Sequence, residues 1–309
     1  MFLGKSHPPY PDLQPTVERQ VNGVCNYNCS YCIQSRARRI GMPSRQTVEH
    51  ILTAFNRLPG IWEIKMSGGE PFAFHGFMKW VIPGIVERTR HFISILTNLS
   101  ADSSTLETFS RATGERLRVF SASYHPEFAD LDGFIDKAVF LSSLLRKNNP
   151  LAQMVINSVV VPDRIPFQFE LKARLEKAGL RYFPQLMKVK GYLYPYDTAA
   201  LKSIETLTEG RESPHDMNRS PNYQGIHCEA GAWYFVVDQR GMAYTCRMAK
   251  RFAEEDDNGC MGSLVDGSFS RKREGRPCPY TICPCTVPAN RGIIRLHRSA
   301  EGEGASRGL

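Results

Sequence analysis

The sequence predicts an α/β fold built on a parallel sheet and followed by a small cysteine-rich unit. Between about residues 15 and 187, short apolar runs alternate with helical patterns to give six βα units. Strands that alternate with helices favour a parallel sheet, open or closed, and six units are fewer than the eight of a full barrel. Six of the nine cysteines then gather between residues 226 and 285, around one hairpin pattern.

The six predicted strands are rich in β-branched or aromatic residues. They lie at residues 16–21, 61–66, 92–96, 117–122, 154–161 and 182–186. Helical patterns separate them at residues 46–58, 77–90, 104–113, 131–146 and 167–178. Ser103 and Ser104 are suited to cap the third helix, and Gly179 is suited to end the fifth.

Changes in composition divide the chain into four parts. The predicted parts are a barrel domain (1–187), a turn-rich linker that covers a site (188–225), a cysteine-rich domain (226–286) and a loose basic tail (287–309). Within the cysteine-rich domain, residues 233–238 and 242–246 have the pattern of a hairpin, with its turn at 238–241.

The composition excludes several classes of protein. The chain has 309 residues, 42% of them hydrophobic, and no apolar run approaches the ~20 residues that span a bilayer. The N-terminus lacks the pattern of a signal peptide, which predicts a cytoplasmic location and a reducing compartment. Nine cysteines in such a compartment are expected to serve metal, cluster or catalytic roles rather than disulfides.

Positive charge is concentrated near the C-terminus. The formal net charge is +8, and residues 270–309 carry +5 of it. A basic segment of this kind indicates nucleic acid, an acidic protein partner or an anionic substrate, and a solvated tail explains it equally well.

Three cysteines follow the first predicted strand in a CxxxCxxC pattern. Cys25, Cys29 and Cys32 are close enough in one loop to converge on a single metal centre. Zinc usually takes four protein ligands in a structural site, so the triplet is one ligand short of a closed zinc site. An iron–sulfur cubane held by three cysteines leaves one iron open to a small-molecule ligand, and cysteine thiolates hold such clusters at spacings of this kind.

A second motif, Met66-Ser-Gly-Gly-Glu70-Pro-Phe72, ends the second predicted strand. Its two glycines allow close backbone approach to a ligand, and the Glu70 carboxylate is able to accept from an ammonium group. The motif lies at the same carboxyl edge of the sheet as the cysteine triplet, and parallel sheets bind their ligands at that edge.

Together the two motifs resemble the radical S-adenosylmethionine (radical SAM) superfamily over about residues 15–187. The resemblance implies a partial (βα)6 TIM-like barrel in which Cys25, Cys29 and Cys32 hold a 4Fe–4S cluster and SAM chelates its fourth iron. It implies that Tyr31 lies against the adenine. It implies that the SAM amino group is held by the segment Ser67, Gly68, Gly69, Glu70 and Pro71. The positions that match the ribose and carboxylate contacts are Thr97, Asn98, Ser121, Ser123 (where the family often has Asp) and Asn157.

The C-terminal cysteines resemble the auxiliary-cluster domains of radical SAM enzymes, called SPASM when complete and twitch when shortened. Cys228 and Cys246 fit C-x12-G-x4-C, whereas the later part departs from the full pattern. Six cysteines are too few for two full clusters, so one auxiliary 4Fe–4S cluster is expected. The candidate ligands are Cys228, Cys246, Cys278, Cys283 and Cys285, one more than the cluster needs, with Cys260 as an ordinary cysteine. A structural zinc site is the alternative.

Three further residues are candidates for catalysis. His125 follows a strand end, Gln185 lies in the sixth predicted strand and Tyr192 follows it. Capping or packing roles explain the same residues. Arg247, beside Cys246, is suited to bind an anionic substrate or to tune a cluster.

The resemblance implies reductive cleavage of SAM to a 5′-deoxyadenosyl radical, which takes a hydrogen from the substrate. The expected substrate is a small molecule of the sugar, cyclitol or nucleoside type, oxidised or rearranged with help from the auxiliary cluster. The first predicted strand begins within about 15 residues of the N-terminus, which leaves no room for a peptide-recognition domain. A peptide maturase is the second hypothesis. A non-catalytic zinc or iron–sulfur protein that binds nucleic acid is the third.

The expected partner is a flavodoxin- or ferredoxin-type electron donor, and no membrane partner is expected. Four arginines after the cysteine triplet, Arg36, Arg38, Arg39 and Arg45, suit the docking of such an acidic protein. A solvated loop explains them equally well.

Overall fold

Six parallel strands form the centre of the structure and confirm the predicted α/β class. The computed structural model describes residues 7–34, 41–213, 215–252 and 259–295. The main sheet has nine strands in the order β12-β11-β10-β1-β2-β3-β4-β5-β6. Its parallel-dominated arrangement is consistent with a partial TIM-like barrel. The six predicted strands are β1 (Thr16–Gln20), β2 (Glu63–Ser67), β3 (Phe92–Thr97), β4 (Leu117–Tyr124), β5 (Gln153–Val160) and β6 (Arg181–Leu186).

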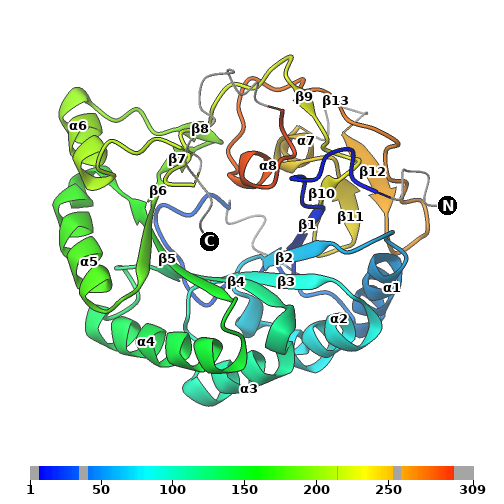
Figure 1. Cartoon of the computed structure of the whole chain (residues 1–309), viewed down its shortest axis with the longest axis horizontal. Coiled ribbons are helices and arrows are strands. Elements are labelled where there is room, and N and C mark those ends of the chain that lie inside the picture. Colours follow the sequence, from blue (N-terminus) through cyan, green and yellow to red (C-terminus); the bar gives the residue numbers. More distant parts are fainter. Residues whose placement is uncertain (1–6, 35–40, 214, 253–258, 296–309) are drawn as a thin grey trace.

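Five helices connect these strands and cover one face of the sheet, called here the outer face (Figure 1). Strand side chains alternate between the two faces. Ile64 and Met66 therefore join the buried core beneath the helices, while Glu63, Lys65 and Ser67 point to the opposite, inner face. The helices are α1 (Arg45–Asn56), α2 (Ile82–Arg88), α3 (Ser103–Thr113), α4 (Leu131–Asn148) and α5 (Ile165–Lys177).

Two helix starts differ from the expectation. Residues 77–90, expected as one helix, form a π-helical turn at Phe77–Val81 before α2, because Pro83 in the first turn of α2 has no N–H to donate. Asp102, rather than a serine, caps α3 by accepting from the Thr105 backbone N–H. Gly179 follows α5 at φ +69°, a left-handed conformation that ends the helix as expected.

A strand from the cysteine-rich segment pairs with the free side of β1. The predicted hairpin is present as β10 (Tyr234–Val237) and β11 (Met242–Tyr244), and β12 (Cys260–Ser263) adds to β11. β10 runs parallel to β1, which the sequence does not reveal. Trp233 stacks on Trp62 with ring centroids 5.8 Å apart, and one hydrophobic core contains both. The main sheet therefore continues into the cysteine-rich segment.

The segment expected as a turn-rich linker contains a helix, α6 (Thr198–Leu207). The helix begins after Asp197, whose side chain accepts from a backbone N–H of the first turn. Ile204 and Leu207 of α6 are buried in a second, smaller hydrophobic cluster. This helix is short and follows Pro195, which is a turn signal in a sequence.

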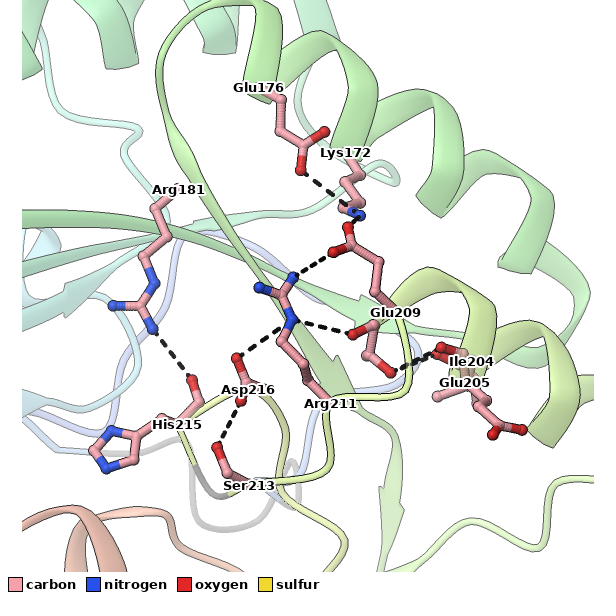
Figure 2. A network of polar contacts seen from close by, with 11 residues as sticks. Lys172, Glu176, Arg181, Ile204, Glu205, Glu209, Arg211, Ser213, His215 and Asp216 are labelled. Atoms are coloured by element: carbon pink, nitrogen blue, oxygen red, sulfur yellow. Dashed lines mark hydrogen bonds and ion pairs between the residues drawn. The ribbon is translucent and has the colours of Figure 1, made fainter. Parts of the chain in front are cut away.

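Polar contacts fasten the chain after α6 to the barrel (Figure 2). Glu209 pairs with Lys172 of α5, and Arg211 pairs with Glu209 at 3.4 Å. Arg181 of β6 donates to the backbone oxygen of His215 at 3.3 Å. Because at least one partner of each ion pair is exposed, each pair is expected to contribute at most about 1 kcal/mol.

The remaining elements are short. No helix in the described ranges is long and apolar enough to cross a bilayer. The short elements are β7 (Lys188–Val189), β8 (Tyr192–Leu193), β9 (His227–Cys228), β13 (Arg276–Pro277), α7 (Arg247–Arg251) and α8 (Val287–Asn290).

The C-terminal segment packs on the inner face of the sheet, where α8 lies inside the ring of helices (Figure 1). Arg291, directly after α8, pairs through Nε with Glu63 Oε2 at 2.8 Å, and the Glu63 side chain is fully buried. Ser94 of β3 donates to Glu63 Oε1 at 2.6 Å. Burial alone would raise the pKa of Glu63, but the Arg291 guanidinium and the hydrogen bonds hold it below its usual value.

Arg291→Met is expected to lower the free energy of unfolding by about 3 kcal/mol, because it leaves the buried Glu63 carboxylate without its main partner. This deficit should be full at neutral pH. It should shrink in the acid range, because the unpartnered Glu63 of the variant is protonated first, and it should be smallest below the lowered pKa of the wild-type Glu63, where the carboxyl is protonated in both proteins. Urea unfolding measures it beside Arg211→Met, whose exposed ion pairs should cost less than about 1 kcal/mol. Equal losses in the two variants would contradict this interpretation.

Candidate active site

The segment from Val21 to Cys32, called here the cysteine loop, is joined to the turn after β2 by hydrogen bonds between backbone atoms. Val21 N–H donates to Ser67 O at 2.6 Å, and Glu70 N–H donates to the Val24 oxygen at 2.9 Å. The Gly69 N–H also donates to the backbone of this loop, at 3.1 Å. The two motifs that the sequence singles out are therefore one structural unit at the carboxyl edge of the sheet.

The two glycines of the turn make room for the cysteine loop. A Cβ atom on Gly69 would lie 2.0 Å from the Val24 oxygen and 2.7 Å from the Cys25 nitrogen. A Cβ on Gly68 would lie 2.5 Å from the backbone oxygen of Asn22. Sequence reasoning assigned this close approach to a ligand, whereas the structure uses it for the chain's own cysteine loop.

The Glu70 carboxylate joins the turn after β2 to the end of β3. Its Oε1 accepts from Thr97 Oγ1 at 2.7 Å and from the Phe72 N–H at 3.1 Å, and its Oε2 accepts from the Asn98 N–H at 2.6 Å. Burial raises the pKa of Glu70 to about 7, although these hydrogen bonds oppose the rise. Three predicted cofactor residues (Glu70, Thr97 and Asn98) thus lie in direct contact, and the carboxylate is already engaged by the protein.

The first cysteine set consists of Cys25, Cys29 and Cys32, none of which forms a disulfide. Burial raises the pKa of Cys29 to about 11, and the nearby charges of Cys32, Glu127 and Cys25 add to the rise. In the described part of the chain, no three Cys, His, Asp or Glu side chains converge as ligands of one metal ion. A four-iron cluster differs from a single ion because it binds each cysteine at a different iron. Neighbouring cysteines on a braced loop, none of them in a disulfide, suit such a cluster.

Tyr31 and His125 meet beside the first cysteine set. Tyr31 Oη lies 3.2 Å from His125 Nδ1, and the two rings stack with centroids 5.9 Å apart. Burial lowers the pKa of His125 to about 4, so the imidazole is neutral at neutral pH. The predicted adenine-contacting residue and the first predicted catalytic residue are therefore neighbours.

Two side chains that sequence reasoning missed brace the cysteine loop. Glu127 Oε2 accepts from the Ser30 N–H at 2.8 Å, and Asn98 Nδ2 donates to Asn26 Oδ1 at 2.9 Å. Glu127 lies two residues after His125, and Asn26 lies next to Cys25. Their closeness in sequence to predicted residues is the one signal that would have pointed to them.

Three more predicted cofactor residues form a hydrogen-bonded row on the inner face of β4 and β5. Ser123 Oγ donates to Asn157 Oδ1 at 2.6 Å, and Asn157 Nδ2 donates to Ser121 Oγ at 2.9 Å. Ser123 pairs in register with Asn157 across the two strands, which explains why side chains 34 residues apart in sequence meet.

Of the other two candidate catalytic residues, Gln185 lies on the inner face of β6, because Phe183, two residues before it, pairs with Asn157 of β5. Gln185 donates to the backbone oxygen of Leu186 at 3.1 Å. Tyr192, in β8, is 52% exposed. Their catalytic roles stay predictions.

The second cysteine set lies beside β9 and α7. It comprises the five candidate ligands Cys228, Cys246, Cys278, Cys283 and Cys285. Cys228, Cys246 and Cys278 line a cavity. Burial raises the pKa of Cys246 to about 12, to which the charges of Cys278 and Cys285 contribute. Burial also raises the pKa of Cys283, and the charges of Cys285, Cys246 and Cys228 contribute there. The five candidate ligands therefore form one group of neighbouring thiols, and three of them line the same cavity.

Cys285 differs from the other four because it faces a carboxylate. Its Sγ donates to Oε1 of Glu18 in β1 at 3.0 Å. Cys246 Sγ accepts from the Ala249 N–H at 3.4 Å and thereby caps α7. Cys260, the expected ordinary cysteine, is in β12 at the far edge of the sheet.

The arginines that were expected to dock an electron donor are only partly described. Arg36, Arg38 and Arg39 lie outside the described residues. Arg45 is exposed in the first turn of α1.

Residues 20–140 match the model of the radical SAM superfamily. The matched segment covers less than half of the chain. The match runs from the end of β1 into α4 and contains the first cysteine set, the Gly68–Gly69 turn and His125. No match was found among curated proteins.

Two solved structures have a fold similar to that of this chain. Native anSMEcpe with bound AdoMet and Kp18Cys peptide has a TM-score of 0.52 and 17% identity, over 82% of this chain and 79% of that one. Streptococcus suis SuiB bound to precursor peptide SuiA has a TM-score of 0.58 and 14% identity, over 84% of this chain and 65% of that one. The similarity of fold extends well beyond residues 20–140.

Proposed function

We propose that this chain is a radical SAM enzyme whose first cysteine set holds a SAM-binding 4Fe–4S cluster. The observation that carries the proposal is the fit of the cysteine loop onto the Gly68–Gly69 turn, within the segment that matches the superfamily. When bound, the reduced cluster and SAM supply the hydrogen-abstracting chemistry of that superfamily. Free thiols must stay reduced to take up iron, which suits a cytoplasmic, reducing compartment.

In this proposal, the chain's own residues position the cofactor. Tyr31 offers an aromatic face to the adenine, and the neutral His125 holds the Tyr31 ring in place through its hydrogen bond and ring contact. The row of Ser121, Ser123 and Asn157 offers hydroxyl and amide groups to the ribose and carboxylate. Glu70 keeps the edges of β2 and β3 in register, so these groups stay at fixed distances from the cysteine loop.

The proposal is tested by incubating the anaerobically reconstituted protein with SAM and dithionite. Formation of 5′-deoxyadenosine and methionine in equal amounts is expected, with none when dithionite is omitted. A protein that takes up zinc alone and leaves SAM intact would refute the enzyme and favour the non-catalytic, nucleic-acid-binding alternative.

We propose that the second cysteine set holds one auxiliary 4Fe–4S cluster through Cys228, Cys246, Cys278 and Cys283. Three of these line the cavity, and the charge of Cys283 acts on the same group. Cys285 is left out because its thiol is hydrogen-bonded to Glu18.

Cys283→Ala is expected to lower the iron content from about eight to about four per chain, because it removes a cluster ligand. Cys285→Ala is the matched control two residues away, and it should keep about eight irons. Iron and sulfide assays after anaerobic reconstitution measure both variants. The opposite pattern, with iron lost in the Cys285 variant and kept in the Cys283 variant, would reverse the ligand assignment.

We propose a small molecule as the substrate, bound at the inner face of the sheet between the two cysteine sets. A peptide substrate is the second candidate, because anSMEcpe and SuiB, which share the fold, were both solved with bound peptides.

A flavodoxin- or ferredoxin-type protein is proposed as the electron donor. Charge reversal at Arg38 and Arg39 should slow flavodoxin-driven turnover at low salt but leave dithionite-driven turnover unchanged.

A further inference from the structure

The inner face of β1 and β2 carries charged residues that the proposed function does not use. Glu18 of β1 lies directly opposite Lys65 of β2 in the register of the sheet. Glu63, two residues before Lys65, is bonded on this face to Arg291 of the C-terminal segment. Ser67, two residues after Lys65, belongs to the predicted SAM-binding turn. Lys65 therefore lies on the inner face, next to that turn.

Glu18 is a buried carboxylate whose two oxygens are both engaged. Its exposed fraction is 2%. Oε2 accepts from Arg247 Nε, and Oε1 accepts from Cys285 Sγ at 3.0 Å. Because Arg247 uses Nε for this bond, its two terminal nitrogens donate to no acceptor within the described residues. The guanidinium is thus bonded to Glu18 through Nε, and Nη1 and Nη2 are left to bind another group.

Two lysines add to the positive charge. Lys65 is partly exposed, and within the described part of the chain its ammonium makes no hydrogen bond or ion pair. Lys188 is 9% exposed and donates to the backbone oxygen of Pro284 at 2.7 Å, one residue before Cys285. Lys65 and Arg247 both lie close enough to Glu18 to lower its pKa, Lys65 also acts on Glu63, and Lys188 lies near Arg247. The three cations Lys65, Lys188 and Arg247 are called here the inner cation group.

A buried hydroxyl without a partner lies beside the same group. Tyr234 Oη has no hydrogen-bond partner among the described residues, and the side chain is fully buried. Tyr234 shares its face of the sheet with Glu18, because it pairs with Thr16 two residues earlier in β1. Its electrostatic neighbours are Glu18, Cys285 and Arg247. A buried hydroxyl normally finds a partner, so this one is free to serve a bound group.

We propose that the inner cation group binds an oxyanion of the substrate, a carboxylate or a phosphate, so that the substrate is a small anionic molecule. The inference rests on the proposed function, since it takes this face as the substrate side of the enzyme. Lys65 lies next to the SAM-binding turn and Arg247 lies next to Cys246. An anion held by both is placed between the two cysteine sets. Arginine and lysine are the usual ligands of carboxylates and phosphates.

The test uses three small probes with a common carbon skeleton and the reconstituted wild-type enzyme with SAM bound. Glycerate, glycerol 1-phosphate and glycerol present a carboxylate, a phosphate and no charge. Calorimetric titration should detect at least one of the two anions and no binding of glycerol. The anion that binds more tightly identifies the oxyanion class.

Variants assign the binding to the inner cation group. Lys65→Met is expected to weaken the preferred anion at least about tenfold, and Lys65→Arg to restore most of the affinity. Lys79→Met, an exposed lysine on the outer side, is the matched control and should bind as the wild type does. Iron content and thermal unfolding establish that each variant is folded and loaded.

The inference would be overturned if Lys65→Met bound the anion as tightly as the wild type does, or if glycerol bound as well as the anions. It would also be overturned, third, if Lys65→Met shifted the auxiliary-cluster potential with no change in anion affinity. The fourth contrary result is binding of a tetra-aspartate peptide where both small anions fail to bind. The third would assign the cations to the cluster, and the fourth would assign the site to a peptide. SAM cleavage by the same wild-type preparation is measured in parallel. Its absence would refute the proposed function, whereas its presence without anion binding would refute this inference alone.

Discussion

Replacing Cys25, Cys29 and Cys32 together by alanine is expected to remove about four irons per chain and all cleavage of SAM. The reason is that these three thiols are proposed as the whole protein ligand set of the first cluster, and a cluster without its thiolates has no other anchor in the loop. The second cysteine set should keep its own cluster, because its cavity and its ligands come from β9, α7 and the segment after β13. Iron analysis and assay of 5′-deoxyadenosine measure both effects.

Cys260→Ala is the control for this triple variant, since Cys260 lies in β12 at the edge of the sheet and belongs to neither set. It should keep about eight irons and full activity. Loss of all iron in the triple variant would mean that the two cysteine sets fold as one unit. Retained SAM cleavage would remove the first set from the active site.

Gly69→Ala is expected to lower SAM cleavage at least about 100-fold, although no cysteine changes. The added Cβ would stand 2.0 Å from the Val24 oxygen and 2.7 Å from the Cys25 nitrogen, both of them backbone atoms. Since neither atom is the tip of a flexible side chain, the cysteine loop must move off the β2 turn. A displacement of about 1 Å in a positioned group is enough for a loss of this size.

Gly133→Ala is the matched control, because the new Cβ in α4 would meet only Asp130 Oδ2, at 3.4 Å. Alanine in this helix should raise the stability by about 0.5 kcal/mol and leave activity unchanged. Full activity of Gly69→Ala would show that the loop tolerates displacement and that the glycines serve something else.

The parallel sheet was predictable because most of its strands are short runs rich in β-branched or aromatic residues. β3 and β4 lie within a residue or two of the predicted ranges, since β-branched and aromatic residues mark them locally. The pairing of β10 with β1 was not predictable. It joins residues more than two hundred positions apart, such as Thr16 and Tyr234, and nothing in either strand specifies the partner.

Site residues that belong to a sequence motif were predictable, whereas contacts that depend on tertiary packing were not. Cys25, Gly69 and Glu70 are recognisable from spacing alone. The contacts of Glu70 with Thr97 and Asn98 follow from the order of β2 and β3, which a parallel sheet places side by side.

The contacts on the inner face of the sheet were predictable only in part. The alternation of Glu63, Lys65 and Ser67 placed these side chains on one face of a strand, so Lys65 was within reach of a sequence argument. The bond between Glu18 and Arg247 was not, because it depends on how the cysteine-rich segment folds back onto β1.

The most direct test of the account is electron paramagnetic resonance of the dithionite-reduced protein, recorded with and without SAM. Two clusters are proposed, each bound by its own cysteine set, and SAM is proposed to bind to one of them. Two overlapping signals are therefore expected, of which SAM shifts one and leaves the other unchanged, and the triple variant should show only the unchanged one. A single signal in the wild type, or two signals that both ignore SAM, would contradict it.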